Sequence, residues 1–436
     1  MSSQIKNQRN ILDKFGIEEL NPMQEEARLA IHTNSDIVLL SPTGTGKTLA
    51  FLLPIIKELN PESSEIQALI LVPTRELAIQ IEQVAHQMGT GYKTNAVYGG
   101  RSGTKDKIDI KHRPAILIGT PGRVADHIRR ENFSTQFIKT LVLDEFDKSL
   151  EIGFESEMKE IAEALPNIEK RILTSATQGV QVPPFVGLKN PTIINYLENG
   201  LPQLKIKAIV SPDKDKLETL VKALNHLGNQ PGIVFCNFKE SIQRVSEFLT
   251  EKNIPHGCFH GGMEQTDRER TLIKFRNGTH QLLVATDLAA RGIDVPAIRF
   301  IIHYHLPLKN REFIHRNGRT ARMHNDGTAY VLQWQLEELP DFARNLAIEE
   351  LTDALRPIAS SWKTLYITGG RKDKISKGDI AGWIMKQGRI AKDQLGAIEI
   401  KQDCAFVAIH ESKADQVIEL VNNSKLKKKK VRVSVV

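Results

Sequence analysis

Three acidic side chains directly follow a short apolar run near the middle of the first half of the chain. The stretch reads VLDEFDKS, and it places Asp144, Glu145 and Asp147 together where a predicted buried strand ends. Carboxylates at such a position must be paired, protonated or neutralised by a cation. The sequence therefore predicts a cation-binding site here, with an acidic cluster that holds no metal as the alternative.

A glycine-rich loop with a lysine lies well upstream. It reads SPTGTGKTLAF, follows the apolar run IVLL and leads into a helical pattern. Gly44 and Gly46 would let backbone N–H groups turn towards phosphate oxygens, and the helix N-terminus adds a favourable dipole. Lys47 would reach the β- and γ-phosphates, and the Thr48 hydroxyl would bind Mg²⁺. The strict phosphate-loop pattern fails at its first position, where the chain has Ser41, so the loop taken alone also fits a chance glycine-rich turn.

The two motifs together predict a nucleoside triphosphate site, because both follow predicted strands of one sheet. Asp144 would hold the Mg²⁺ ion, partly through water, and Glu145 would orient and deprotonate the attacking water. Ser41, Thr43 and Thr45 complete the predicted nucleotide-binding loop.

The composition indicates an ordinary globular protein. The chain has 436 residues, of which 40% are hydrophobic and 25% charged, enough for two or three domains. No apolar run is long enough to cross a bilayer, and the polar start MSSQIKNQRN gives no sign of export. The three cysteines, Cys236, Cys258 and Cys404, lack C-x-x-C spacing. We therefore expect reduced thiols in a cytoplasmic protein, and a monomer.

The positive charge is unevenly distributed. From Ser360 to the end the chain has 16 Lys or Arg and 8 Asp or Glu, whereas the preceding residues have 43 basic and 44 acidic side chains. Such asymmetry predicts a polyanionic partner, most simply nucleic acid. A solubilising surface is the alternative.

Short apolar runs alternate with helical patterns in two stretches of the chain. The first contains DIVLL, ALILVP, AILIGT, TLVLDE and RILTSAT, and the second contains GIVFCNF, HQLLVATD, RFIIHYHLP and GTAYVLQW. This alternation predicts an α/β fold with two mostly parallel sheets in tandem, each flanked by helices. We place the first domain at 1–200, a linker at 198–207 and the second domain at 206–352.

A third segment, 361–436, has a different rhythm. From TLYITGG to VRVSVV its strand and helix patterns follow the order βαββαβ, which fits a small ferredoxin-like sheet of the RNA-recognition type.

The ordered motifs of the chain resemble those of the DEAD-box RNA helicases. From about residue 15 to about 335 they are NPMQ, SPTGTGKT, PTREL, GG, TPGR, DEFD, SAT, ATDLAARGID and HRNGRTAR. One such motif arises easily by chance, but the ordered set across two α/β domains is specific. The resemblance implies two RecA-like domains with ATP in the cleft and RNA across both, and an RNA-dependent ATP hydrolase that opens short RNA duplexes.

The resemblance also assigns roles around the nucleotide. Gln24 would read the adenine edge, and Asp294, after Gly292, would approach the ribose. Arg319 and Arg322 would act as arginine fingers on the γ-phosphate. They reach it only when the domains close, so hydrolysis would depend on closure.

Further motif positions are implied to couple ATP to RNA or to contact RNA. Coupling is implied for Asp147, Ser175 and Thr177. Contact with RNA phosphates and sugars is implied for Pro73, Thr74, Arg75, Gly100, Thr120, Pro121, Gly122, Arg123, Gln265, Arg268 and Thr286. Such contacts position the strand without reading its sequence.

The chain departs from the family pattern at three places. Phe146 stands where the family has Ala, and we predict that it packs in the interior and that activity survives, although overpacking costs about 1–3 kcal/mol unless neighbours are smaller. No aromatic precedes residue 15, so adenine stacking is weaker or is supplied by Phe15. His305 stands where the family often has an acid.

The C-terminal segment resembles the RNA-binding domain of DbpA-type DEAD-box proteins. That subfamily implies recognition of large-subunit ribosomal RNA and a role in ribosome assembly. Tyr366 and Phe406 lie on the predicted first and third strands, where bases could stack, with core packing as the alternative. Arg371, Lys372 and Lys374 add positive charge for salt-dependent phosphate contacts. The run SKLKKKK adds more, or is a solvated edge strand.

Other functions remain as alternatives. A non-hydrolysing, ATP-dependent RNA clamp or general RNA chaperone would result if Phe146 blocked turnover. A DNA-directed helicase is a second alternative, against which the RNA-binding segment argues. The stretch HGCFH, 256–260, could hold a metal, but it lacks a further Cys/His pair at zinc spacing, and ordinary strand residues fit it better.

Overall fold

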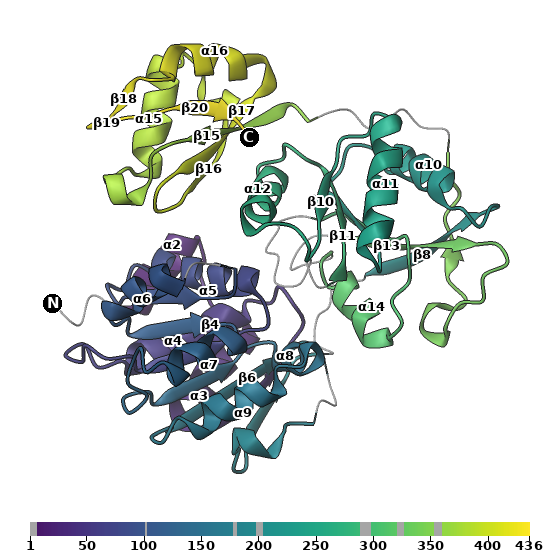
Figure 1. Ribbon diagram of the computed structural model, residues 1–436. Helices are drawn as coiled ribbons and strands as arrows, with labels where there is room; N and C mark the ends of the chain where they lie inside the picture. Colours follow the sequence, from purple (N-terminus) through teal and green to yellow (C-terminus); the bar gives the residue numbers. More distant parts are fainter. Residues whose placement is uncertain are drawn as a thin grey trace. The chain divides into compact units, whose positions relative to one another are not determined.

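The computed structural model, shown in Figure 1, has two compact units, one formed by the described residues up to 197 and the other by those from 204 onwards, and each is described separately. The described residues are 7–100, 103–177, 181–197, 204–287, 298–320, 327–352 and 360–436. Within these ranges, no helix combines the length and apolar character needed to cross a membrane.

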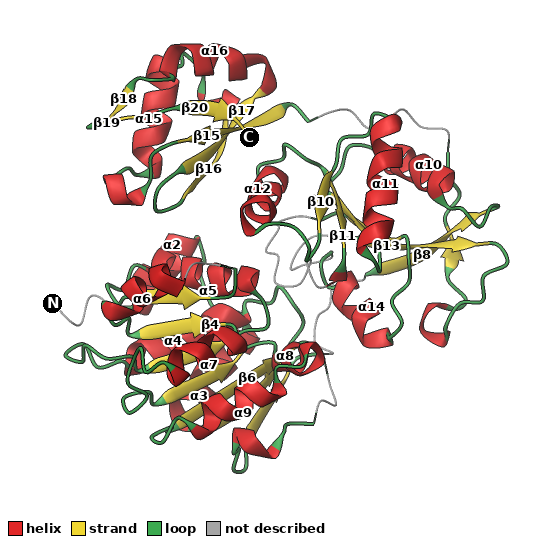
Figure 2. Cartoon of the chain, in the orientation of Figure 1, coloured by secondary structure: helices red, strands yellow, loops and turns green. Residues whose placement is uncertain are grey.

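The first unit is built on a seven-stranded parallel sheet in the order β3-β4-β2-β5-β6-β1-β7, with helices on both faces (Figure 2). The strands are β1 (Asp36–Leu40), β2 (Ala68–Leu71), β3 (Thr94–Val97), β4 (Ile116–Gly119), β5 (Thr140–Leu143), β6 (Lys170–Ser175) and β7 (Thr192–Asn195). The helices are α2 (Gln8–Phe15), α3 (Pro22–Thr33), α4 (Lys47–Glu58), α5 (Arg75–Met88), α6 (Gly103–Lys111), α7 (Pro121–Arg129), α8 (Phe146–Ile152) and α9 (Glu155–Glu163).

Two apolar clusters hold this unit together, one on each face of the sheet. Along β1, Ile37 and Leu39 join the cluster that includes α3, α4 and α5, whereas Val38 joins the cluster on the other face. Strand side chains alternate between faces, and a sheet covered on both sides buries all of them. This explains why the central strands read as continuous apolar runs.

The second unit contains another seven-stranded parallel sheet, in the order β10-β11-β9-β12-β13-β8-β14. Its strands are β8 (Lys205–Ser211), β9 (Gly232–Phe235), β10 (Gly257–Phe259), β11 (Leu282–Ala285), β12 (Phe300–His303), β13 (Thr328–Trp334) and β14 (Ala347–Ile348). Its helices are α10 (Leu217–Leu227), α11 (Lys239–Glu251), α12 (Gln265–Arg276) and α14 (Asn310–Asn317).

The same unit ends in a small antiparallel sheet in the order β16-β17-β15-β20. The elements are β15 (Trp362–Ile367), α15 (Lys377–Gln387), β16 (Leu395–Ile400), β17 (Ala405–His410), α16 (Glu411–Val421) and β20 (Val433–Val435), with a hairpin of β18 (Lys425–Leu426) and β19 (Lys429–Lys430) before the last strand. The predicted fold class, two parallel-sheet domains and a small βαββαβ sheet, is confirmed.

The predicted linker at 198–207 is wrong at its C-terminal end. Lys205 already begins β8, which pairs with β13 from Lys205 to Ser211. The segment KIKAIVS is partly exposed at its first three positions. Because lysines flank Ile206 at its start, this strand does not read as a continuous apolar run.

Candidate functional site

The phosphate loop lies between β1 and α4. Lys47 begins α4, and its Nζ donates to the carbonyl oxygens of Ser41 at 2.5 Å and Pro42 at 2.8 Å. The hydroxyls of Ser41 and Thr45 are 2.7 Å apart. The Ser41 N–H donates to the carbonyl of Ser175 at 3.0 Å. Ser41 therefore fixes the loop to β6, although it replaces the usual glycine.

Gln24 lies against the end of this loop. Its Nε2 donates to the Gly46 carbonyl at 3.2 Å, and its Oε1 accepts from the backbone N–H of Asn21 at 3.0 Å. Gly46 has φ +86°, and a Cβ at this position would be 2.3 Å from Gln24 Nε2. Only glycine fits both the backbone conformation and the close approach. The predicted adenine reader is thus held beside the predicted phosphate loop.

Asp144 and Glu145 follow β5, where Thr174 of β6 holds both. The Thr174 hydroxyl donates to Asp144 Oδ1 and accepts from the Glu145 N–H at 3.1 Å. Glu145 has a left-handed backbone, with φ 48°, and stands directly before α8. All three residues are buried. One hydroxyl on the neighbouring strand therefore positions the carboxylate of Asp144 and the backbone of Glu145.

The electrostatics of this pair fit a bound cation. Burial, together with the charge of Glu145, raises the pKa of Asp144 to about 6, while the Thr174 hydrogen bond and Lys47 act in the opposite direction. A divalent cation would offset both the desolvation and the like-charge repulsion. Asp144, with Thr48 on the first turn of α4, supplies the hard oxygen ligands that Mg²⁺ prefers.

Asp147 connects the acidic motif to the SAT motif. Its Oδ2 accepts from the Thr177 hydroxyl at 2.9 Å. Ser175 Oγ in turn donates to the Thr177 carbonyl at 2.9 Å and accepts from the Thr177 N–H at 3.0 Å. The three residues predicted to couple the sites therefore form one buried hydrogen-bonded group.

Phe146 packs in the interior of the first unit. It is 2% exposed and belongs to the apolar cluster that contains Leu143 and Met158. Beside it lies a cavity of about 490 Å³, whose lining also includes Val38 and Pro184. The open space next to the ring indicates that the aromatic is accommodated without overpacking.

In the first unit, Arg75 and the GG motif come together. The guanidinium of Arg75 covers the turn at Gly99 and Gly100, where a Cβ on Gly100 would be 2.4 Å from Arg75 Nη1. Thr74 caps α5 by accepting from the Leu77 N–H at 3.2 Å. Pro73 directly precedes this cap, so the PTREL motif forms the start of α5.

The TPGR motif forms the start of α7. Thr120 is the residue before the helix, and Pro121 is its first residue. Arg123 donates through Nε to Asp106 Oδ2 of α6 at 2.7 Å. Asp106, like Thr174, was not predicted to matter, because neither residue belongs to a motif that the sequence singled out.

In the second unit, the ATD and HRNGR motifs are joined by an ion pair that sequence reasoning missed. Arg316 of α14 binds Asp287 with two hydrogen bonds, of 2.6 and 2.5 Å. Arg316 also donates to the carbonyl of His305 at 2.5 Å, so this position contributes through its backbone. The signal in the sequence was the acid after Thr286. Arg319 follows α14 and is 5% exposed.

Of the other residues predicted to act in this unit, some are described by the structure and some are not. Gln265 and Arg268 lie on the first turns of α12, and the Arg268 guanidinium stacks on the Phe259 ring at 5.0 Å. Gly292, Asp294 and Arg322 lie outside the described residues.

The HGCFH stretch fits ordinary structure. Both ring nitrogens of His256 lie 2.8 Å from protein oxygens, the Ser246 hydroxyl and the Ile254 carbonyl. Cys258 lies on β10 beside them.

In the C-terminal domain, exposed cations lie on the turn before α15, at the start of α15 and on the hairpin β18–β19. We define the basic surface as the exposed residues Arg371, Lys372, Lys374, Lys377, Lys425, Lys427, Lys428 and Lys430. Lys427 donates to the Lys374 carbonyl at 2.7 Å, and Lys429 donates to Asp373 at 2.7 Å. The hairpin β18–β19 is thus tied to the turn before α15.

The face of this sheet opposite its helices has a different environment. Phe406 is 5% exposed and packs edge-on against Tyr366, with ring centroids 5.5 Å apart. Glu399, paired with Phe406 across the strands, binds Arg276 of α12 with two hydrogen bonds, of 2.7 and 2.9 Å. Phe406 is therefore buried outside the apolar cluster between the sheet and its helices, whereas Tyr366 is half-buried.

Comparison with known families gives three matches along the chain. The models described as DEAD/DEAH box helicase, helicase conserved C-terminal domain and DbpA RNA binding domain match residues 21–183, 215–324 and 364–435. The chain is 32% identical to the ATP-dependent RNA helicase DbpA of Bacillus subtilis, over 97% of this chain and 96% of the relative. It is 29% identical to DbpA of Escherichia coli, over 97% and 95%.

Solved structures give the same result. Saccharomyces cerevisiae Dbp5 bound to RNA and ADP BeF3 matches with a TM-score of 0.68 and 26% identity, covering 76% of this chain and 89% of Dbp5. The helicase Mss116 bound to single-stranded RNA and UDP-BeF matches with a TM-score of 0.69 and 27% identity, covering 77% of this chain and 73% of that protein.

Proposed function

The chain belongs to the DEAD-box ATP-dependent RNA helicases, and from this premise we propose that it opens short RNA duplexes locally, on large-subunit ribosomal RNA during ribosome assembly. As a member of this family it is an RNA-dependent ATPase. We further propose that its functional domains are 1–200, 206–352 and 361–436. A cytoplasmic monomer fits this role.

The single observation that best supports the enzymatic proposal is the shared contact of Thr174 with Asp144 and Glu145. In the proposed reaction Asp144, with Thr48, would hold Mg²⁺, which would neutralise charge on the phosphates. Glu145 orients the attacking water and takes its proton. Lys47 would leave its two carbonyl partners to bind the β- and γ-phosphates.

Further contacts to the nucleotide follow from the motif positions. Gln24 would bind adenine, and the loop residues Ser41, Thr43, Gly44, Thr45 and Gly46 would surround the phosphates. Gly292 and Asp294 would approach the ribose, while Arg319 and Arg322 would contact the γ-phosphate from the second domain. Because these groups come from both domains, hydrolysis would require closure.

Coupling to RNA would pass through the group formed by Asp147, Thr177 and Ser175, which ties the acidic motif to β6. In the first unit, RNA would lie against the starts of α5 and α7, where Arg75 and the TPGR motif present backbone N–H groups and a cation. In the second unit, Gln265, Arg268 and Thr286 would make the matching contacts.

The position of Phe146 argues against the non-hydrolysing clamp. Its ring lies in the apolar cluster, 2% exposed and beside a cavity, while Asp147 keeps its hydrogen bond to Thr177 and the Glu145 N–H keeps its bond to Thr174. Nothing in this arrangement blocks the carboxylates.

The proposed ribosomal RNA target depends on the C-terminal domain. Its match to a DbpA RNA binding domain supports RNA recognition, and the basic surface supplies exposed cations for phosphates. Arg371, Lys372 and Lys374 would therefore bind the RNA backbone, and a base would stack on the half-buried Tyr366 ring.

Strand separation tests this proposal. The full-length protein and ATP are mixed with a duplex shorter than one helical turn and with a duplex of three turns, each with and without a large-subunit ribosomal RNA extension. We expect the protein to separate only the short duplex that carries the ribosomal RNA extension. Equal separation of both lengths would contradict local opening, and indifference to the extension would remove the ribosomal target.

A further inference from the structure

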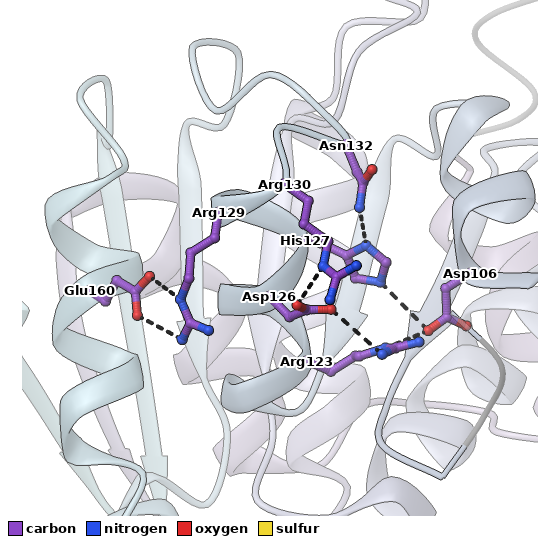
Figure 3. Close-up of polar contacts among 8 residues, drawn as sticks. All are labelled: Asp106, Arg123, Asp126, His127, Arg129, Arg130, Asn132 and Glu160. Atoms are coloured by element: carbon purple, nitrogen blue, oxygen red, sulfur yellow. Dashed lines mark hydrogen bonds and ion pairs between the residues drawn. The ribbon is translucent and has the colours of Figure 1, made fainter. Parts of the chain in front are cut away.

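Asp106 of α6 is a buried acid that the proposed mechanism does not use. Its side chain is fully buried, and its Oδ2 accepts from Arg123 Nε at 2.7 Å (Figure 3). A buried carboxylate is retained only with a charged or hydrogen-bonding partner, and removing either partner of such a pair is strongly unfavourable. The pair therefore joins α6 firmly to the first turn of α7.

His127, one helical turn after Arg123, approaches the same carboxylate oxygen. Its Nε2 is 3.5 Å from Asp106 Oδ2, and its Nδ1 is 2.8 Å from the side-chain amide nitrogen of Asn132. An amide nitrogen only donates, so Nδ1 accepts and the ring proton resides on Nε2, facing Asp106. One carboxylate thus contacts two side chains on the same face of α7, Arg123 through a hydrogen bond and His127 through the longer 3.5 Å approach.

The other side of the Arg123 guanidinium faces a second acid. Asp126 Oδ2 is 3.6 Å from Arg123 Nη1, and Asp126 Oδ1 accepts from Arg130 at 2.7 Å (Figure 3). The Arg130 hydrogen bond, with further help from Arg123, holds the pKa of Asp126 below its usual value. Arg123 therefore lies between two carboxylates, and its side chain is 18% exposed. Its charge is largely matched within the protein.

The far end of α7 is attached differently. Arg129 binds Glu160 of α9 with hydrogen bonds of 2.7 and 3.0 Å, but both side chains are exposed (Figure 3). Exposed pairs stabilise little, whereas breaking a buried pair is costly. Of the two ion pairs, the buried one with Asp106 is therefore the stronger restraint, and it acts at the start of α7.

We propose that Asp106 is a positioning residue for RNA. By holding Arg123, with His127 beside the same carboxylate, it fixes the first turn of α7 so that the backbone of Thr120–Gly122 meets the RNA phosphates. Arg123 acts chiefly as the partner of Asp106 and contributes little direct phosphate contact. This inference rests on the proposed RNA contact at the TPGR motif.

The first test compares Asp106→Asn with Glu160→Gln, which removes a carboxylate from an arginine at the other end of the same helix. In Asp106→Asn, the RNA concentration that gives half-maximal ATPase rises about tenfold, while the rate at saturating RNA and nucleotide binding without RNA stay unchanged. In Glu160→Gln, the RNA concentration for half-maximal ATPase, the rate at saturating RNA and nucleotide binding all stay unchanged. An unchanged or lower RNA requirement in Asp106→Asn overturns the proposal, because releasing Arg123 would then leave binding intact or improve it.

The second test uses Arg123→Gln, whose amide can still donate to Asp106 and so keeps the fold measurable if Asp106→Asn unfolds. A positioning role predicts a weaker RNA interaction with an unchanged salt dependence, and no further loss in the double variant. A direct phosphate contact instead lowers the log–log salt slope by about 0.7–0.9, and this result would overturn the proposal. If the ATPase activity of the wild-type protein does not respond to RNA at all, the proposed function fails. If the wild type responds but the variants give either of the contradicting results above, only the role of Asp106 is excluded.

Discussion

The Thr174 hydroxyl donates to the Asp144 carboxylate, and the same oxygen accepts from the Glu145 N–H at 3.1 Å. This single side chain fixes both the proposed metal ligand and the proposed base from the neighbouring strand. It lies just before the SAT motif, so the strand that carries the coupling residues also positions the acids.

Replacing Thr174 with Val tests this relationship. Val keeps the shape but leaves a buried N–H and a carboxylate without their partner, which costs about 1–3 kcal/mol. We expect a higher Mg²⁺ concentration for half-maximal nucleotide binding and a turnover lowered about tenfold or more. Thr174→Ser, which retains the hydroxyl, is the control. Wild-type Mg²⁺ dependence in the Val variant would show that Thr174 does not position the site.

Phe146→Ala restores the side chain that the family has. Truncating a buried Phe costs about 3–5 kcal/mol, and here it enlarges an existing cavity of about 490 Å³. We expect the first unit to unfold at a lower denaturant concentration, while the RNA-stimulated turnover of the folded enzyme stays within a few-fold of wild type. A large gain in turnover would mean that Phe146 hinders hydrolysis.

Acid is expected to destabilise the second unit. Burial lowers the pKa of His303 to about 3 and those of His280 and His305 to about 4. Each unfolded histidine binds a proton below about pH 6.5, and the folded form resists it, so stability falls as the pH drops from 6.5 towards these values. For His303 alone the loss between pH 7 and 5 is up to about 2 kcal/mol.

Tryptophan fluorescence measures this effect, because Trp334, Trp362 and Trp383 all belong to the second unit. The denaturation midpoint should fall between pH 7 and pH 5. His303→Gln, which can still donate to Asn317, should reduce this pH dependence. An equal pH dependence in the variant would exclude His303 as a major contributor.

The basic surface of the C-terminal domain should supply salt-dependent RNA affinity. Replacing Arg371, Lys372 and Lys374 together with Gln is expected to lower the log–log salt slope of RNA binding by about 2. The matched control replaces Lys386, Arg389 and Lys392, three exposed cations outside the basic surface, with Gln. Equal effects of the two sets would mean that the charge acts nonspecifically.

Deleting 361–436 should reduce the selectivity for ribosomal RNA more than the maximal ATPase rate.

The sequence was sufficient for the fold class because the central strands are buried on both faces and read as apolar runs. It failed where strands are short or partly exposed. β7 has two exposed positions, and β8 begins with lysines, so neither shows a continuous apolar pattern.

The site was predictable where backbone geometry requires particular residues. Gly46 is needed by its positive φ and by the approach of Gln24, and this requirement is visible as a motif. Thr174, Asp106 and Arg316 were missed, because each acts through a partner distant in sequence: Asp144, Arg123 and Asp287, respectively. A single sequence does not record such pairs.

The central claim is tested most directly by ATP hydrolysis with the full-length protein in three conditions: no RNA, a generic single-stranded RNA and large-subunit ribosomal RNA. Glu145→Gln serves as the control and should lose at least about a hundredfold in turnover while still binding ATP. The account predicts strong stimulation by ribosomal RNA and little by the generic strand. The absence of hydrolysis in all three conditions, with ATP and RNA both bound, would contradict it and favour a non-hydrolysing RNA clamp.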